Sequence, residues 1–457
     1  MVRIIIWCIL LTVSTVLFRK CSGTLNPCKL NILSFSFFLI ILQTIIGAVL
    51  TSVGFTGHYT YRLLNNPEEY TQMGIFYSII LIILLPLISF FILKILKINP
   101  ETEYNNYLRK KTEADNISMY FGLMVFASII CITFLVVMLF KIGYVPLIKL
   151  FIHNSDFNFS LERQINEDIN IFGVTYIKSI MILYAIPVLS FLAFGFFIAT
   201  KKRRWGMLFA VLFVASIIVK TYNFAKAPIV LYLLILMIIF IVYNGGISIK
   251  ILIACGSFGV VLLVMGYQLL GSSNGYLDIY NGILGRTFFT QFGTLCMHFE
   301  AFSEYFDFLH GRSLYPTMLS ILGMDPDTHI RSARVVMELY NTEDVYSGEA
   351  GVMNTVFIGE AYANWGVLGI FLGILWIGIV LTVCFVLFMK LKKNAITIAY
   401  YGIITQQLVM GLEGGFTDYL YNSTYILNFA GLFALYYLPM ITEKITIILN
   451  KIKQKNN

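Results

Sequence analysis

The chain has 457 residues, of which 58% are hydrophobic and only 12% are charged, and its mean hydropathy is +0.82. Soluble globular domains carry about 25% charged residues, so this composition excludes an ordinary soluble protein. The net charge of +8 fits the membrane topology described below better than it fits a nucleic-acid-binding surface, and we expect no nucleic-acid partner. The composition predicts an all-α polytopic membrane protein that forms one integral membrane domain over residues 1–457.

Apolar segments long enough to cross a bilayer recur along the chain. A hydrocarbon core about 30 Å thick requires ~20 apolar residues per helix, and about eleven segments meet or approach this length. They are 4–18, 30–54, 73–93, 118–140, 174–199, 206–222, 227–243, 249–271, 355–389, 395–412 and 424–441. Because Arg19 and Lys20 follow the first segment and no small-x-small cleavage site does, we expect a signal-anchor helix there.

The distribution of basic residues predicts the orientation. Lysine and arginine accumulate in cytoplasmic loops because they resist translocation. If the C-terminus is inside, eleven helices place 20 of the 32 basic residues on the cytoplasmic side. They include Arg19, Lys20, Lys94, Lys97 and Lys110, and also Lys390, Lys392 and Lys393 after the ninth segment. The same arrangement places the longest polar stretch, 272–354, outside the membrane. We therefore expect a large extracytoplasmic loop within the single membrane domain.

The large loop has an unusual set of charges. Its basic residues are four arginines and no lysine, and it carries ten carboxylates. Loops of this length are usually functional, and arginine binds phosphate through a bidentate fork that lysine lacks. Because free nucleotides are scarce outside the cell, we infer that the arginines bind a lipid pyrophosphate. They are Arg286, Arg312, Arg331 and Arg334.

Two helices are predicted inside this loop. Apolar residues spaced alternately four and three apart between Phe288 and Leu309 predict an amphipathic helix. This helix either lies in the membrane interface or packs on the transmembrane bundle with a solvated polar face. Further on, Asp325 and Pro326 predict the N-cap and first position of a second helix. The charged residues on one face of each helix are Arg286, Glu300 and Glu304, with His298 at the edge, and then Arg331, Arg334 and Glu338.

Signatures of cofactors are missing from the sequence. Its seven cysteines form no CxxC pair and no Cys/His ligand spacing, and no P-loop or Rossmann glycine pattern occurs. We therefore expect neither a metal nor another cofactor. Two basic residues in smaller exported loops are further candidates for phosphate binding. Arg163 lies among acidic residues, and Lys226 precedes a helix that starts at Pro228.

One segment carries a resemblance to a known family. The run Gly351-Val-Met-Asn-Thr-Val-Phe-Ile-Gly-Glu-Ala-Tyr-Ala-Asn-Trp-Gly-Val-Leu-Gly369 follows the large loop and leads into a helix. It resembles bacterial O-antigen and capsular polysaccharide repeat-unit polymerases. His310-Gly-Arg-Ser313 and Lys226-Ala-Pro228 fit the same pattern. These polymerases often have an arginine followed some ten residues later by a glycine in a smaller exported loop, which Arg163 and Gly173 match closely.

The resemblance implies a metal-independent glycosyltransferase with a fold like that of the C-type membrane enzymes. Such an enzyme transfers a growing glycan from undecaprenyl pyrophosphate to a new lipid-linked repeat unit, at the outer face of the bacterial cytoplasmic (inner) membrane. Its expected partners are this lipid-linked oligosaccharide, the bilayer, a chain-length regulator and a flippase. Arginines would stabilise the pyrophosphate leaving group, and a base would activate the sugar hydroxyl. The candidates for the base are His298, His310, Glu349 and Glu360.

Two other functions remain open at this stage. An O-antigen ligase shares the loop architecture and differs mainly in its acceptor. A flippase or transporter would place charged residues in mid-membrane and would show internal repeats. The sequence shows no convincing repeat, and its ionisable residues gather in loops and at helix ends. We therefore favour the polymerase.

Overall fold

The structure, a computed structural model, describes residues 2–152, 157–171, 173–225, 227–269, 278–346 and 351–456. Within these ranges the chain is helical, and its β pairings are two isolated bridges, Glu113 with Asn394 and Ile171 with Val174. The all-α class is therefore confirmed. The chain divides into two compact units, and the organisation as one membrane domain stays a prediction. Unit 1 comprises Met1–Asn106, Ser272–Lys390 and Thr405–Ser423, and unit 2 comprises Tyr107–Gly271, Leu391–Ile404 and Thr424–Asn457.

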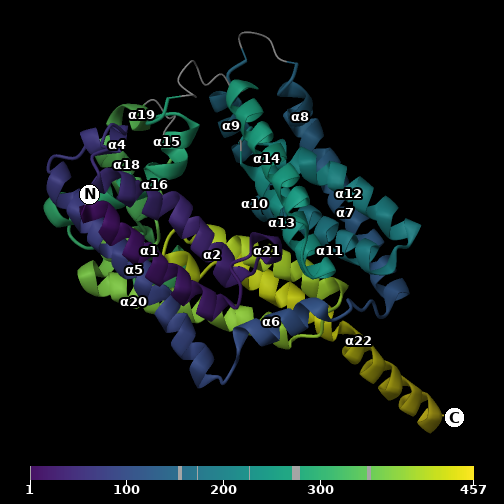
Figure 1. Ribbon diagram of the computed structural model, residues 1–457. Helices are drawn as coiled ribbons and strands as arrows, with labels where there is room; N and C mark the ends of the chain where they lie inside the picture. Colours follow the sequence, from purple (N-terminus) through teal and green to yellow (C-terminus); the bar gives the residue numbers. More distant parts are fainter. Residues whose placement is uncertain are drawn as a thin grey trace. The chain divides into compact units, whose positions relative to one another are not determined.

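Unit 1 contains the N-terminal helices, most of the polar stretch and the helix that follows it (Figure 1). Its first elements are α1 (Val2–Ser22), η1 (Pro27–Lys29), α2 (Ile32–Ile40), η2 (Ile41–Ile45), α3 (Ile46–Ser52), α4 (Tyr59–Arg62), α5 (Pro67–Ile95) and α6 (Pro100–Arg109), whose end lies in unit 2. The polar stretch forms α15 (Ile283–Phe288), α16 (Thr290–Glu300), η4 (Ala301–Tyr305), α17 (Pro316–Ile321), η5 (Pro326–Thr328), α18 (Ser332–Tyr340) and α19 (Thr342–Tyr346). Then come α20 (Ile358–Lys390), α21 (Ala395–Gly411), which starts in unit 2, and η6 (Thr417–Tyr419).

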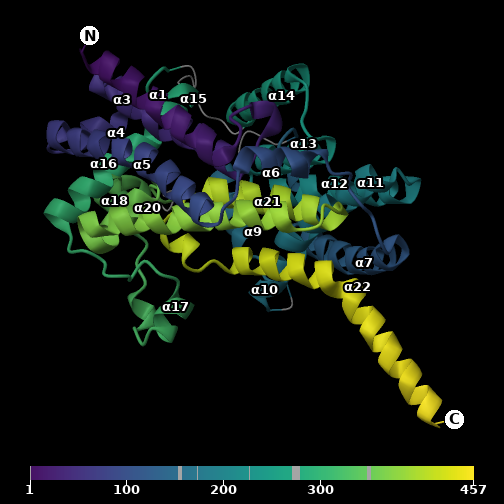
Figure 2. The same cartoon turned by 60° about the horizontal axis from the view of Figure 1, so that its bottom comes forward.

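The core of unit 1 forms around α16, which packs against α5, α18 and α20 (Figure 2). Phe292, Leu295 and Phe299 are fully buried on it. Gly74 of α5 permits this close approach, because a Cβ atom there would lie 2.8 Å from the Sγ atom of Cys296. The apolar stripe therefore packs on the bundle rather than lying in the membrane interface.

The two helices predicted in the polar stretch differ from those observed. The first is divided into α15, α16 and the π-helical turn η4, and it ends before Phe306. His298 and Glu300 were predicted at the edge and on the polar face, but both are fully buried, because α18 covers that side. For the second, Asp325 caps the 3-10 turn η5, and the α-helix begins only at Ser332.

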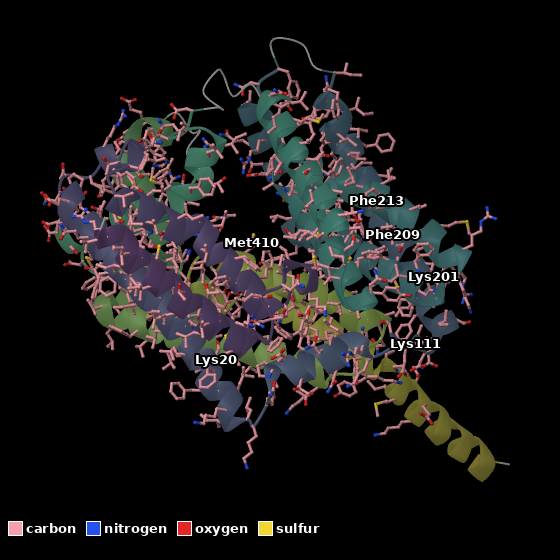
Figure 3. The ribbon with its side chains drawn as sticks, viewed as in Figure 1. Lys20, Lys111, Lys201, Phe209, Phe213 and Met410 are labelled. Carbon is pink, nitrogen blue, oxygen red and sulfur yellow. The ribbon has the colours of Figure 1, made fainter. Side chains whose placement is uncertain are left out.

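Unit 2 is built mainly from long apolar helices. They are α7 (Ile117–Ile142), α8 (Pro146–Lys149), α9 (Phe159–Asp168), α10 (Thr175–Ile177), the π-helix η3 (Lys178–Tyr184), α11 (Ala185–Thr200), α12 (Arg203–Thr221), α13 (Pro228–Asn244), α14 (Ile249–Leu269) and α22 (Ser423–Asn456), whose first residue belongs to unit 1. Trp205 is buried where α12 packs on α11, and its ring stacks on Phe196 at 4.4 Å. Phe209 and Phe213, one turn apart on α12, continue this aromatic face (Figure 3).

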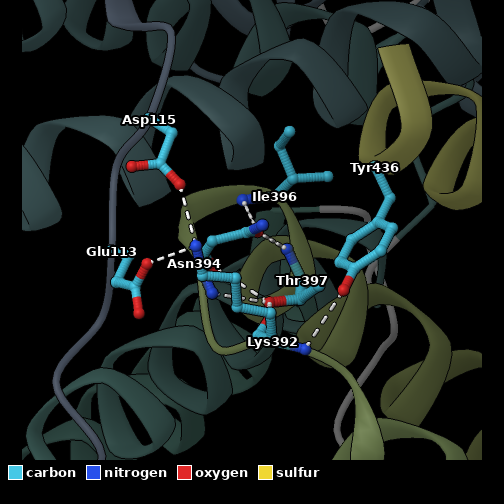
Figure 4. A network of polar contacts seen from close by, with 7 residues as sticks. All are labelled: Glu113, Asp115, Lys392, Asn394, Ile396, Thr397 and Tyr436. Carbon is cyan, nitrogen blue, oxygen red and sulfur yellow. Dashed lines mark hydrogen bonds and ion pairs between the residues drawn. The ribbon is translucent and has the colours of Figure 1, made fainter. Parts of the chain in front are cut away.

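The start of α21 is held by a polar network in unit 2 (Figure 4). Asn394 and Thr397 form a capping box: the Asn394 side chain accepts from the Thr397 amide at 2.9 Å, and the Thr397 hydroxyl accepts from the Asn394 amide at 2.9 Å. Lys392 pairs with Glu113 at 2.5 Å and with Asp115 at 3.0 Å. These contacts fix the turn between α20 and α21 at one of the predicted cytoplasmic positions.

Nine helices in the described residues are long and apolar enough to span a membrane. They are Val2–Lys29, Ile32–Ser52, Pro67–Ile95, Ile117–Ile142, Lys178–Thr200, Arg203–Thr221, Ile249–Gly266, Ile358–Lys390 and Thr417–Lys444. By this measure of helix length and hydropathy, the prediction of about eleven membrane-spanning helices is too high. The difference arises because α13 and α21 contain only 17 residues each.

Candidate functional site

The segment 351–369 connects the polar stretch to α20, and its polar side chains each anchor a different part of that stretch. Asn354 accepts a hydrogen bond from Arg331 at 3.2 Å, and Tyr362 bonds to Ser303 at 2.7 Å. Further along, α20 is kinked, with non-helical backbone angles at Trp365 and Gly366. Gly366 has φ +59°, and an added Cβ atom would lie 3.0 Å from the Phe308 ring, so both its conformation and its contact favour glycine.

Asn364, just before this kink, is the most extensively bonded of these side chains. It is fully buried. Its Nδ2 atom donates to the Ser313 hydroxyl at 2.6 Å and to the Glu360 carbonyl at 2.9 Å, while its Oδ1 atom accepts from the Gly311 amide at 2.9 Å. Its backbone carbonyl accepts from the amide of His310, which adopts the left-handed φ of 49°. Asn364 thus holds the turn 309–313 against α20.

This turn forms one wall of a small polar pocket in unit 1. The pocket has a volume of about 60 Å³. It combines residues from three parts of the sequence: the polar stretch, the start of α20 and the segment after α21. Its lining residues are Ser313, Tyr315, His329, Arg331, Glu360, Gly414, Gly415, Thr417 and Asp418.

Glu360 lies at the buried side of the pocket. Both carboxylate oxygens are engaged by Thr417: the amide donates to Oε2 at 2.9 Å, and the hydroxyl lies 3.1 Å from Oε1. Gly415 is required for this placement, because an added Cβ atom would lie 2.4 Å from Oε2. Thr417 therefore holds Glu360 in one orientation, with no room for a larger residue at position 415.

His329 and Tyr315 form another wall, with their rings stacked at 6.4 Å. Nδ1 of His329 lies 2.7 Å from the Leu314 carbonyl. A carbonyl only accepts hydrogen bonds, so Nδ1 carries the hydrogen, and neutral His329 has its lone pair on Nε2. The Tyr315 hydroxyl donates to Asp418 at 3.1 Å. Burial and the nearby Asp418 charge raise the pKa of Tyr315 to about 12, so it stays a hydrogen-bond donor at neutral pH.

Five of the six predicted cations lie in the described residues, four of them in unit 1 and Arg163 in unit 2. Arg331, at the N-cap of α18, lines the pocket. Arg312 is half-buried in the turn and donates to the Leu309 carbonyl at 3.2 Å, and Arg334 pairs with Glu338 at 2.7 Å. Arg286 lies exposed on α15, and Arg163 lies on α9 of unit 2, paired with Glu167 at 3.0 Å. Lys226 lies outside the described residues.

Three of the four predicted bases lie in the described residues, and of these three Glu360 lines the pocket. His298 is fully buried on α16, where Nδ1 bonds to the Thr294 carbonyl at 2.8 Å, and burial lowers its pKa to about 4. His310 belongs to the turn 309–313 but is exposed and does not line the pocket, and Glu349 lies outside the described residues. The catalytic roles proposed for these residues remain predictions.

Several residues of this region were not predicted from the sequence. His329 was not among the predicted bases, although its Nδ1 donates to the Leu314 carbonyl and leaves Nε2 as the nitrogen that can accept a proton. Thr417 and Asp418 follow an apolar helix and belong to no local motif, so only the tertiary fold brings them to Glu360. Glu300 was missed as an anchor: it accepts from the amides of Asn65 and Asn66, each at 2.9 Å, and from the hydroxyl of Tyr340 at 2.5 Å.

The helices and the pocket define a multi-pass membrane protein with an ordered polar site beside one of its longest apolar helices. Residues 1–425 match the protein family described as "Putative O-antigen polymerase". Because the match covers nearly the whole chain, the protein belongs to this O-antigen polymerase family. Membership implies a lipid-linked glycan substrate. No curated protein and no solved structure matches the chain.

Proposed function

We propose that this protein polymerises oligosaccharide repeat units linked to undecaprenyl pyrophosphate, at the outer face of the bacterial cytoplasmic membrane. Family membership supports the reaction class. The observation that carries the proposal is that Arg331 and Glu360, which lie 29 residues apart in the chain, line one pocket with His329. A cation, a carboxylate and a histidine with a free acceptor nitrogen are the groups that glycosyl transfer from a pyrophosphate requires.

In the proposed reaction, a hydroxyl oxygen of the acceptor repeat unit attacks the anomeric carbon of the lipid-linked chain. The bond from that carbon to the pyrophosphate oxygen breaks, and lipid pyrophosphate leaves with the bonding electrons. The hydroxyl proton passes to the base. Arg331 stabilises the charge that develops on the leaving group, and we assign Arg286, Arg312 and Arg334, which belong to the same unit, to binding the carrier before and after this step. No metal is required for this scheme.

We assign the base to His329 rather than to Glu360. Glu360 is fixed by bonds from Thr417, whereas the Leu314 carbonyl holds His329 with Nε2 available as an acceptor. Glu360 then acts as a carboxyl group held in one orientation, whose oxygen dipoles stabilise the cationic sugar in the transition state. The volume of about 60 Å³ is well below the ~300–1,000 Å³ of small-molecule sites. The pocket therefore admits reacting groups, and the sugars bind outside it.

The decisive experiment uses purified full-length protein in detergent with lipid-linked repeat units and EDTA. We expect a ladder of glycans from the wild type. His329→Asn should lose about 100-fold or more in rate, within the range for removal of a general base, and should retain carrier binding. A reaction that is inactive in EDTA and restored by Mg²⁺ would contradict metal independence.

A deletion strain separates this function from the alternatives. Loss of a polymerase leaves surface glycan with a single repeat unit. Loss of a ligase leaves polymer on the lipid carrier, and loss of a flippase traps single units inside the cell. Long surface chains in the deletion strain would overturn the polymerase proposal.

A further inference from the structure

A second, larger pocket lies in unit 1 where α1 and α5 end and α6 begins. Its volume is about 740 Å³. Its lining combines basic side chains with apolar ones. The basic members are Arg19, Lys20, Lys94 and Lys97, and the apolar members are Val16, Phe90, Leu93 and Ile98. Lys20 lies near the end of α1 (Figure 3). The basic members all belong to the set that the sequence places on the cytoplasmic side.

The charge of this pocket is largely uncompensated. All four basic side chains are exposed, and none of them takes part in an ion pair recorded for the described residues. The acidic member of the lining is Glu101, at the start of α6. Four positive charges thus face one negative charge across a pocket large enough for a phosphate-bearing headgroup.

The backbone at Lys97 is the second observation. Lys97 has φ 55°, the left-handed conformation that ends a helix and usually requires glycine. Its amide donates to the Lys94 carbonyl at 3.1 Å, and the Ile98 amide donates to Leu93 at 2.9 Å, as in a Schellman cap. A lysine in this position is strained by about 1 kcal/mol relative to glycine. Strain of this kind is often retained for function.

The opposite wall is fixed by a close backbone contact. Gly23 has φ +73°, and an added Cβ atom would lie 2.6 Å from the Glu101 amide nitrogen, so only glycine allows α6 to start here. Asn99 caps that start by accepting from the Thr102 amide at 3.1 Å. The positive end of the α6 dipole is therefore held at the pocket.

We propose that this pocket binds the phosphate-bearing headgroup of an anionic glycerophospholipid from the cytoplasmic leaflet. Anionic lipids concentrate in that leaflet, and basic pockets between membrane helices bind such headgroups. The apolar side chains beside the charges provide a surface for the upper part of the acyl chains. Topology signals and helix dipoles explain basic residues at helix ends, but neither explains why four of them line one pocket beside apolar side chains.

The test measures thermal unfolding of the full-length protein in detergent during titration with phosphatidylglycerol. We expect a rise in Tm, because a ligand that binds only the folded state stabilises it. Phosphatidylcholine should give little change. Each basic side chain near a lipid surface contributes about fivefold in affinity, so Lys94→Ala/Lys97→Gly should bind phosphatidylglycerol roughly 25-fold more weakly.

Two variants make the test specific. Lys97→Gly alone should raise the Tm without lipid, because glycine relieves the strain, and should weaken phosphatidylglycerol binding about fivefold. Lys110→Ala, which removes an exposed charge outside the pocket on the same predicted side, should bind as the wild type does.

Equal binding by Lys97→Gly and the wild type would overturn the proposal. So would an equal response to phosphatidylcholine, or saturation of the site by inorganic phosphate alone. None of these readouts depends on the polymerase activity.

Discussion

Asn364 in unit 1 and Asn166 in unit 2 are both buried, and the side chain of each holds a polar segment in place. The arginines near these two asparagines are held by different kinds of contact. Asn364 bonds to Gly311 and Ser313 and so shapes the pocket that contains Arg331. Asn166 donates to the Tyr222 carbonyl at 2.8 Å and positions α9. The arginine of α9, Arg163, is 54% exposed and pairs with Glu167 one turn away.

This difference shows how to rank cations that look alike in sequence. Arg331 donates to Asn354, 23 residues away, so its position depends on the tertiary fold. The pair between Arg163 and Glu167 is an i,i+4 contact on a helix surface, which contributes only ~0.3–0.5 kcal/mol. We therefore expect changes around Arg331 to alter catalysis strongly, and equivalent changes around Arg163 to have small effects.

The largest contrast should come from the two asparagines. Asn364→Ala removes three side-chain bonds and leaves the Gly311 amide and Ser313 hydroxyl without these partners, at ~1–3 kcal/mol for each unsatisfied group. We predict a loss of polymer of about 100-fold or more in a complemented deletion strain. Asn166→Ala should reduce polymer less than tenfold at equal protein level. Equal losses in the two variants would remove the distinction between the loops.

A smaller steric change tests the pocket directly. Gly415→Ala adds a methyl group whose ideal position lies 2.4 Å from Glu360 Oε2, and overpacking of this kind costs ~1–3 kcal/mol. We predict a fall in polymerisation rate of roughly ten- to a hundredfold. Gly351→Ala is the matched control, because its added Cβ atom meets nothing within 4 Å. Wild-type activity in Gly415→Ala would show that the position of Glu360 is unimportant.

Conservative replacement of the arginines should have a more moderate effect. Lysine keeps the charge but loses the planar fork, and a bond to a charged group contributes ~1.5–3 kcal/mol. We predict that Arg331→Lys polymerises about tenfold more slowly, and that Arg163→Lys stays within about threefold of the wild type. Rate measurements with purified protein at saturating substrate test this. A larger defect in Arg163→Lys would place the carrier at α9.

The smallest expected effect is a dependence of stability on pH. His298 has its pKa lowered to about 4 by burial, so the unfolded chain binds the extra proton first as pH falls below about 6.5. Stability is therefore lost between about pH 6.5 and 4. We predict that His298→Gln reduces the drop in Tm between pH 7 and 5 by a few degrees.

Two other groups titrate in the same range. His58 has a similarly lowered pKa of about 4, and Glu413 has a raised pKa of about 8, both mainly because of burial. His58 adds to the effect of His298. Glu413 acts in the opposite direction, because its pKa is higher in the folded state, so its protonation stabilises the folded state as pH falls. The difference between the wild type and His298→Gln isolates His298. An unchanged pH dependence in the variant would show that His298 does not titrate on unfolding.

Local patterns predicted the class of fold and part of the site. Hydropathy located most of the helices, and the segment 351–369 pointed to the start of α20 and to Glu360. Local patterns failed where partners come from distant sequence. Glu300 was placed on a solvated face by helix periodicity, but the amides of Asn65 and Asn66 provide the bonds that allow it to be buried. Thr417, Asp418 and the orientation of His329 likewise depend on tertiary contacts that no spacing rule records.

The kink at Trp365 and Gly366 separates a short arm of α20 from a long one. At 1.5 Å per residue, residues 367–390 span about 36 Å, which is close to the thickness of one bilayer core. Glu360 lies on the short arm, which folds back so that its neighbour Ala361 packs against Gly369 and Gly373 in the first turns of the long arm. Under the proposed function, catalysis then takes place near one end of the long arm, so a lipid-linked donor reaches it by lateral diffusion within its leaflet. The reaction rate would follow the number of carriers per unit area of membrane rather than their concentration in solution.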